Sequence, residues 1–389
     1  MKTIRKEPLP FHQYSLDEED TREVVETLKS GWIALGPRTQ QFEEDFRRYI
    51  GCRHAVGLYS CTAAITLALA GLEIGPGDEV ITSPIAYPAT ANEILLLGAK
   101  PVFVDVEAGT LNMDVSQVAE KIGARTKAIL PVHFAGHPCD MDAILSIAQE
   151  NSLAVIEDAA HAIESEYKGR KVGAIGDATC FSFYATKNMT TGEGGMLTTN
   201  NDKLAERARI LRLHGITKDA WKRSQAEKVR YWEQVTLGYK CNMFDLQAAL
   251  GITQLKKLPR FWERRKVLWE KYDAAFRDIP EIQPLQVKEG VKSAYHVYVI
   301  KLDSERLRIS RNEFMDELTK RNVGTAVHFR SLTLQPYYQE RFPELRNTVP
   351  LAEALSERVL TLPLYPKMED ADLQYVVEMV SDIVEKNRA

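Results

Sequence analysis

The sequence predicts an α/β protein with a large domain built on a mostly parallel sheet, followed by a smaller α+β domain. In the first two-thirds of the 389-residue chain, short apolar runs alternate with amphipathic ones, as in sheets whose strands are joined by helices. Several apolar runs are nearly continuous, which is typical of strands buried on both faces. A chain this long also exceeds the size at which a single hydrophobic core keeps growing, so two domains are expected.

Seven short apolar runs are the predicted strands of the large sheet. They are Ala55–Leu58, Glu79–Ser83, Pro101–Val106, Ala128–Val132, Ala154–Ile156, Ala178–Phe183 and Gly195–Thr199. Amphipathic stretches between them predict helices at Thr62–Ala70, Ala89–Leu97, Met141–Gln149 and Leu204–Leu213. Turn residues such as Gly75-Pro76-Gly77-Asp78 separate strands from helices.

Two further helical patterns follow, at Phe244–Leu258 and Phe261–Phe276, and the second is rich in charged and aromatic residues. Beyond them, Ala294–Leu302, a helix in the 310s and a final helix at Asp370–Glu385 predict a compact α+β unit. We therefore place the domain boundary near residue 260. This gives a large domain of residues 1–260, with the N-terminal arm included, and a small domain of residues 261–389.

Composition excludes several classes of protein. A net charge of −4 leaves no basic surface for nucleic acid or an anionic membrane. Five irregularly spaced cysteines indicate reduced thiols, and no apolar stretch has the length of a signal peptide or a membrane span, so we expect a cytoplasmic protein. His133, His137 and Cys139 are metal-ligand types, but a Gly and a Pro interrupt their spacing, and we predict no metal site.

One lysine, Lys187, has the setting of an amine nucleophile. The apolar run that begins at Phe181 ends in small and hydroxyl residues, then Lys187, then the glycine cluster Gly192-Glu193-Gly194-Gly195. Glycines allow backbone to approach a ligand closely, and burial at a strand end lowers the pKa of an amine. A lysine that is simply solvated is the alternative, and for this stretch taken alone it is the commoner case.

Three other strand ends carry polar or aromatic residues. Open α/β sheets bind their ligands at these carboxyl ends of the strands. Asp158, in the acidic pair with Glu157, suits a cationic partner such as a protonated pyridine nitrogen, although helix N-termini also favour acids. Ser60 or Thr62 opens a helix and suits a phosphate, although each also reads as an ordinary N-cap. Tyr87 suits stacking on a planar ring, although loop tyrosines often only pack.

These segments, FSFYATKNMTTGEGGMLTTN and EDAAHA above all, resemble the DegT/DnrJ/EryC1/StrS aminotransferases. GPGDEVITSP, GAKPVFVDV and LGYKCNMFDLQAALGITQL match too, and the resemblance runs from about residue 10 to the end. It implies a fold-type-I enzyme that uses pyridoxal 5′-phosphate (PLP). By position, Lys187 matches the Schiff-base lysine, Asp158 the partner of the ring nitrogen, His161 a neighbour of the phenolic oxygen and Tyr87 the stacking aromatic.

The resemblance assigns the phosphate to Thr62, the Ala63 backbone and Ser182, with Lys240 or Asn242 contributed by the second subunit of a homodimer. It also implies glutamate as amino donor and a nucleotide-linked 4-keto-6-deoxy sugar as acceptor, with amination at C4 favoured over C3. His328, Arg330, His133 and Tyr184 are the candidates for substrate binding. A sugar dehydratase would carry His in place of Lys187, so that residue argues against one, while a non-catalytic regulator stays an open alternative.

Overall fold

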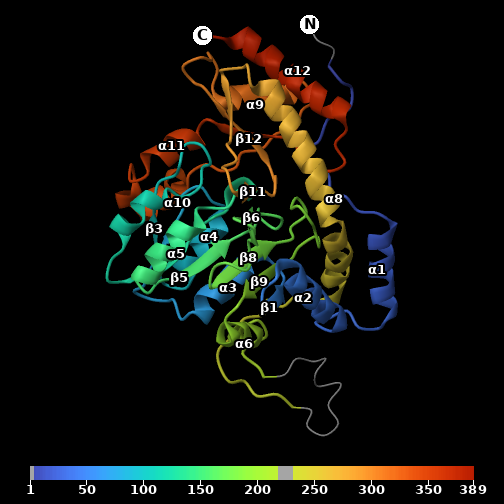
Figure 1. Cartoon of the computed structure of the whole chain (residues 1–389), viewed down its shortest axis with the longest axis vertical. Helices are drawn as coiled ribbons and strands as arrows, with labels where there is room; N and C mark the ends of the chain where they lie inside the picture. The colour runs from blue at the N-terminus through green and yellow to red at the C-terminus, as the bar shows by residue number, and fades with distance from the viewer. Residues whose placement is uncertain (1–3, 218–230) are drawn as a thin grey trace.

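The computed structural model describes residues 4–217 and 231–389, and its main feature is a seven-stranded sheet (Figure 1). The strand order is β1 (His54–Leu58), β9 (Gly195–Thr199), β8 (Ala178–Ser182), β5 (Ala154–Asp158), β4 (Thr126–Leu130), β2 (Glu79–Thr82) and β3 (Lys100–Phe103). β9 runs antiparallel to both of its neighbours, and the remaining pairs are parallel. The prediction of a mostly parallel seven-stranded sheet is confirmed, with small differences at strand ends. The largest is at β3, which ends at Phe103 rather than at Val106.

Helices cover both faces of this sheet. One core contains apolar residues of α3 (Cys61–Gly71), α4 (Pro88–Leu96) and α6 (Asp202–Leu211) against one face. Two further cores contain residues of α5 (Met141–Glu150) and α2 (Pro37–Ile50). Successive residues of β4 alternate between these cores, with Ala128 and Leu130 in the first and Ile129 in another. Because both faces are covered, the strands are rich in apolar residues.

The helix α8 (Asp245–Phe276) is continuous, so our prediction of two helices separated near Pro259 is wrong. Proline removes one hydrogen bond from a helix interior and usually ends or kinks it. Here Leu255 and Leu258 pack against the sheet, while Leu268 and Trp269 pack in the C-terminal core, so burial on both sides of Pro259 holds one helix together. Residue 260, our predicted domain boundary, therefore lies within α8.

The C-terminal part has its own core around a three-stranded antiparallel sheet. Its strands are β10 (Ile282–Pro284), β12 (Tyr298–Leu302) and β13 (Val359–Leu362), and its longer helices are α9 (Arg311–Lys320) and α12 (Asp370–Asn387). Leu9 belongs to this core and pairs with Val323, so the N-terminal arm that we assigned to the large domain lies here against the C-terminal part.

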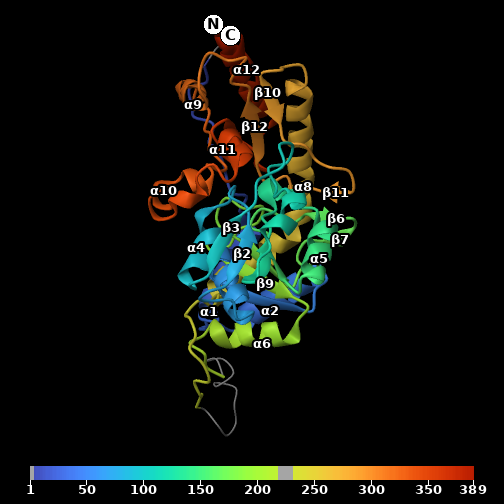
Figure 2. The same cartoon turned by 90° about the vertical axis from the view of Figure 1, so that its left-hand side faces the viewer.

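The remaining elements are short or peripheral. α1 (Glu18–Lys29) packs along α8, and β6 (Glu166–Tyr167), β7 (Arg170–Lys171) and β11 (Val291–Lys292) form a small third sheet. α10 (Pro336–Arg341) and α11 (Pro350–Ser356) lie to one side of the C-terminal part (Figure 2). All five cysteines are buried and unpaired. Within the two described ranges, no helix combines the length and apolar character needed to cross a membrane.

Candidate active site

A cavity of about 600 Å³ opens where β5 and β8 end and where α3 and α4 begin. Residues 328 and 329 of the C-terminal part complete its wall. Six predicted cofactor residues line it, namely Thr62, Tyr87, Asp158, His161, Ser182 and Lys187, and so do two predicted substrate residues, Tyr184 and His328. The structure therefore brings together side chains from five separate segments of the chain.

Lys187 is partly exposed in this cavity, on the turn that follows β8. Its backbone N–H donates to the carbonyl of Tyr184 over 2.9 Å, which shapes the turn. Burial lowers the pKa of the Lys187 amine to about 8, although attraction by Cys61 and Asp158 opposes the effect. At neutral pH the neutral amine is therefore far more abundant than it is for a solvated lysine.

Asp158 is buried at the carboxyl end of β5 and is held at several points. Its Oδ2 accepts a hydrogen bond from the Thr90 hydroxyl over 2.6 Å, and its Oδ1 accepts one from the backbone N–H of Ala160 over 3.1 Å. Its backbone N–H donates to the carbonyl of Pro131, and its carbonyl accepts from the N–H of His133. Thr90 was absent from the predicted site.

The first turn of α3 forms another wall of the cavity. Ser60 caps the helix by accepting a hydrogen bond from the Ala63 N–H over 3.1 Å. That N–H, which we had predicted to hold the phosphate, is therefore already bonded within the chain. Gly195 lies so close that an added Cβ would be 2.3 Å from the Ser60 carbonyl, so only glycine lets β9 begin here. A helix N-terminus beside the hydroxyls of Thr62 and Ser182 suits an anion.

His161 and its aromatic neighbours form the remaining wall. The His161 ring stacks on Phe329 at a centroid distance of 5.7 Å and lies 4.4 Å from the His296 ring. Burial lowers the pKa of His161 well below its usual range, with a further contribution from the charge on Lys187, so this ring is neutral. Its buried Nδ1 has no hydrogen-bond partner among the residues that the structure describes. Phe329 and His296 were not predicted.

Five predicted residues do not line the cavity, and one of them is Ala63, whose N–H is bonded to Ser60 as described above. His133 is fully buried elsewhere, its Nε2 2.8 Å from the Glu157 carboxylate and its Nδ1 accepting from the Cys139 N–H, so the expectation that it contacts substrate is not supported. Arg330 is exposed and paired with Glu357 over 2.7 Å. The other two are on the chain segment before α8, where the Lys240 amine donates to the Asn242 side chain over 2.6 Å.

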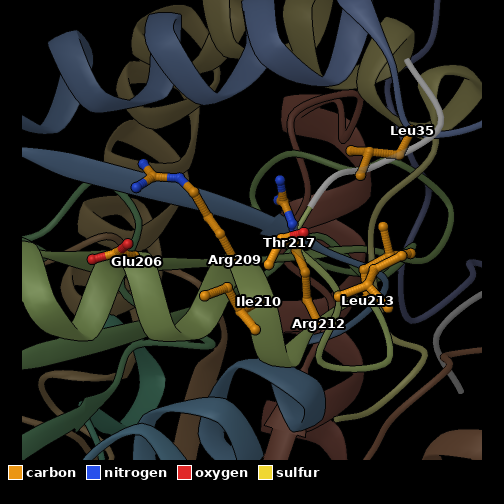
Figure 3. Close-up of a pocket in the computed structure, with 8 residues that line it drawn as sticks. Leu35, Glu206, Arg209, Ile210, Arg212, Leu213 and Thr217 are labelled. Carbon is orange, nitrogen blue, oxygen red and sulfur yellow. The ribbon is translucent and has the colours of Figure 1, made fainter. Parts of the chain in front are cut away.

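A second cavity, of about 270 Å³, lies beside the end of α6 (Figure 3). Arg209 and Arg212 point into this region, where Arg212 is tied to the Glu43 carboxylate and to the carbonyl of Gly57. None of the predicted catalytic or cofactor residues lines it. The cavity around Lys187 is therefore the candidate active site.

Known proteins share the sequence pattern and the fold of this chain. The model of the DegT/DnrJ/EryC1/StrS aminotransferase family matches residues 14–381. The chain belongs to this family.

Three relatives illustrate the similarity. The spore coat polysaccharide biosynthesis protein SpsC of Bacillus subtilis is 48% identical over 97% of both chains. Spr1654 of Streptococcus pneumoniae, named as a sugar aminotransferase and solved in its PLP form, is 36% identical, with a TM-score of 0.91 over 97% of this chain and 99% of its own. PseC of Helicobacter pylori, an aminotransferase involved in the biosynthesis of pseudoaminic acid, is 30% identical, with a TM-score of 0.91 over 98% of this chain and all of its own.

The protein is a PLP-dependent sugar aminotransferase of fold type I, as predicted. The residues of the cavity fit the cofactor. The Lys187 amine of lowered pKa suits its aldehyde, and the buried Asp158 carboxylate suits its ring nitrogen. The His161 Nδ1, which has no partner in the described part of the chain, suits the phenolic oxygen, and the helix N-terminus with its hydroxyl groups suits the phosphate.

Proposed function

We propose that this enzyme transfers an amino group from glutamate to a nucleotide-linked 4-keto-6-deoxy sugar, with amination at C4 favoured over C3. The observation that carries the proposal is the presence of the Lys187 amine and the Asp158 carboxylate in one cavity with the N-terminus of α3, which suits an anion. SpsC acts in polysaccharide biosynthesis and PseC in making pseudoaminic acid, which supports an amino sugar destined for a cell-surface polymer.

In this proposal each side chain of the cavity has a separate task. Lys187 holds the cofactor covalently at rest and afterwards moves a proton to and from the donor's α-carbon, for which an amine with a pKa of about 8 is suited. The bound cofactor supplies an electron sink that stabilises negative charge at that carbon. Asp158 pairs with the ring nitrogen and keeps it protonated, and neutral His161 donates or accepts a hydrogen bond at the phenolic oxygen.

The residues of the cavity walls bind and orient the cofactor and the second substrate. Thr62, Ser182 and the N-terminus of α3 would hold the phosphate, and Tyr87, 64% of whose surface is exposed, would supply an aromatic face for the cofactor ring. Tyr184 and His328 face the second substrate. Burial lowers the pKa of His328 to about 3, so it acts as a neutral hydrogen-bonding group.

A homodimer completes the site. Among the described residues that line the cavity, Lys187 is the only lysine or arginine, so the charges of a substrate diphosphate need donors from outside it. Lys240 and Asn242 lie outside the cavity of their own chain, on a segment that exposes several apolar side chains. We propose that this segment reaches the cavity of the second subunit.

The test is turnover with glutamate and a panel of UDP-, dTDP- and GDP-linked 3-keto and 4-keto sugars, with 2-oxoglutarate measured and the product identified by NMR. We expect 2-oxoglutarate and a 4-amino-6-deoxy sugar to form in equal amounts. A 3-amino product would replace the C4 assignment. Binding of the cofactor without 2-oxoglutarate from any ketosugar would favour the non-catalytic regulator.

A further inference from the structure

Thr90 makes a direct contact with the acid of the site. It lies in the first turn of α4, it is 1% exposed, and it lines the cavity. Its hydroxyl donates to Oδ2 of Asp158 over 2.6 Å, within the range of a strong charge-assisted hydrogen bond. The backbone N–H of Thr90 donates to the carbonyl of Tyr87, three residues earlier. One helical turn therefore carries the predicted stacking ring and the donor to Asp158.

The other contacts of Asp158 come from backbone. Pro131 and His133 at the end of β4 bond its main chain, and the Ala160 N–H bonds Oδ1. Within the described part of the chain, the Thr90 hydroxyl is the one side-chain group that hydrogen-bonds the carboxylate. The backbone hydrogen bonds thus fix the position of the Asp158 main chain. The Thr90 hydroxyl then fixes the orientation of the Asp158 carboxylate.

We propose that Thr90 is a positioning residue, which orients the Asp158 carboxylate toward the ring nitrogen of the cofactor. This inference rests on the role proposed above for Asp158. Thr90 takes no part in proton transfer to substrate. It holds one oxygen of the carboxylate of Asp158, which lines the cavity. Because Tyr87 and Thr90 lie at the start of α4, the same helix positions the Tyr87 ring and the donor to the acid.

The experiment compares Thr90→Val, which keeps the shape of the side chain but loses the donor, with Thr90→Ser, which keeps the donor. For Thr90→Val we expect kcat and the affinity of the apoenzyme for PLP to fall by about ten- to a hundredfold, the range for one hydrogen bond to a charged group. KM for glutamate should change little. The absorbance change that accompanies loss of the ring-nitrogen proton should move to lower pH. Thr90→Ser should stay within about threefold of the parent, because its hydroxyl group is retained.

A matched control is available between α3 and α4. The Thr66 hydroxyl donates to the Glu93 carboxylate, also over 2.6 Å, and neither residue lines the cavity. Thr66→Val removes an equivalent contact away from the site, so its cofactor affinity and its absorbance titration should match those of the parent.

Combination with Asp158→Asn separates the two proposals. If Thr90 acts through the carboxylate, Thr90→Val should cause no further loss of PLP affinity in the Asp158→Asn background. The role of Thr90 would be overturned by any of three results. These are an equal loss of PLP affinity in both backgrounds, equal effects of Thr90→Val and Thr90→Ser, and a Thr90→Val protein with unchanged kcat and absorbance titration. An Asp158→Asn protein with the spectrum and affinity of the parent would instead overturn the proposed role of Asp158.

Discussion

At the scale of single residues, the chemistry depends on how the fold treats one amine. Lys187 lies on the turn after β8, in a cavity where burial disfavours its charge, and attraction by Cys61 and Asp158 only partly offsets this effect. With a pKa of about 8, about one tenth of such amines are neutral at pH 7, compared with about one in three thousand for a solvated lysine.

This shift predicts how the apoenzyme takes up PLP. Only the neutral amine attacks an aldehyde, and its fraction rises with pH until the pKa is passed. The rate constant for covalent attachment, followed by stopped-flow absorbance, should therefore rise up to about pH 8 and then level off. A blocked lysine derivative in solution, as the reference, should keep rising toward pH 10. An apoenzyme that follows the reference curve would contradict the lowered pKa.

At the scale of elements, the site depends on how β4 and β5 are joined. His133, at the end of β4, pairs with Glu157 of β5 in a fully buried contact, and Glu157 also accepts hydrogen bonds from Gly176 and Thr179. Glu157 precedes Asp158 in β5, and Val132, the residue before His133, pairs with Asp158. His133 is thus a residue that supports the site, where the sequence suggested one that contacts substrate.

His133→Ala should therefore act on stability. Removing His133 takes one hydrogen-bond partner from the buried Glu157 carboxylate, and we expect a loss of about 2–3 kcal/mol in the free energy of unfolding, measured with urea. His54→Ala is the matched control, because His54 pairs over 2.6 Å with Asp202, whose side chain is 60% exposed, and a loss of about 1 kcal/mol or less is expected. A His133→Ala protein of normal stability with a raised KM would restore the original prediction.

How far the sequence predicts the structure also differs between elements. The strands of the large sheet were predictable because burial on both faces makes them continuous apolar runs. The break at Pro259 was predicted from local preference, which packing at both ends of α8 overrides. Thr90 was missed because its contact with Asp158 joins residues 68 positions apart, and nothing in the sequence near either residue records it.

At the scale of the whole molecule, the site is built where several cores meet. Segments of the large sheet and residues 328 and 329 of the C-terminal part line one cavity, so the site forms where these two parts of the chain meet. The segment from Tyr231 to Phe244 leaves large apolar side chains exposed near α6 (Figure 1). Such a surface is typical of an interface between subunits.

Leu237, which is 85% exposed on this segment, offers a test of the dimer. In a dimer that buries it, Leu237→Glu places a charge in an apolar contact, which should weaken association by roughly tenfold or more. Sedimentation should show a shift from the dimer toward the 44.0 kDa of one chain, together with weaker PLP binding. Val287→Glu, at an exposed apolar residue in the C-terminal part, should leave the dimer unchanged. A parent protein that is active as a monomer would contradict the shared site.

The most direct test of the account is borohydride reduction of the PLP-loaded enzyme, followed by proteolysis and mass spectrometry of the labelled peptide. We predict a single pyridoxyl group on Lys187 in the parent protein and no label at that position, together with no visible cofactor absorbance, in Lys187→Ala. Label on another lysine, or turnover retained by Lys187→Ala, would show that the cavity described above is not where the reaction takes place.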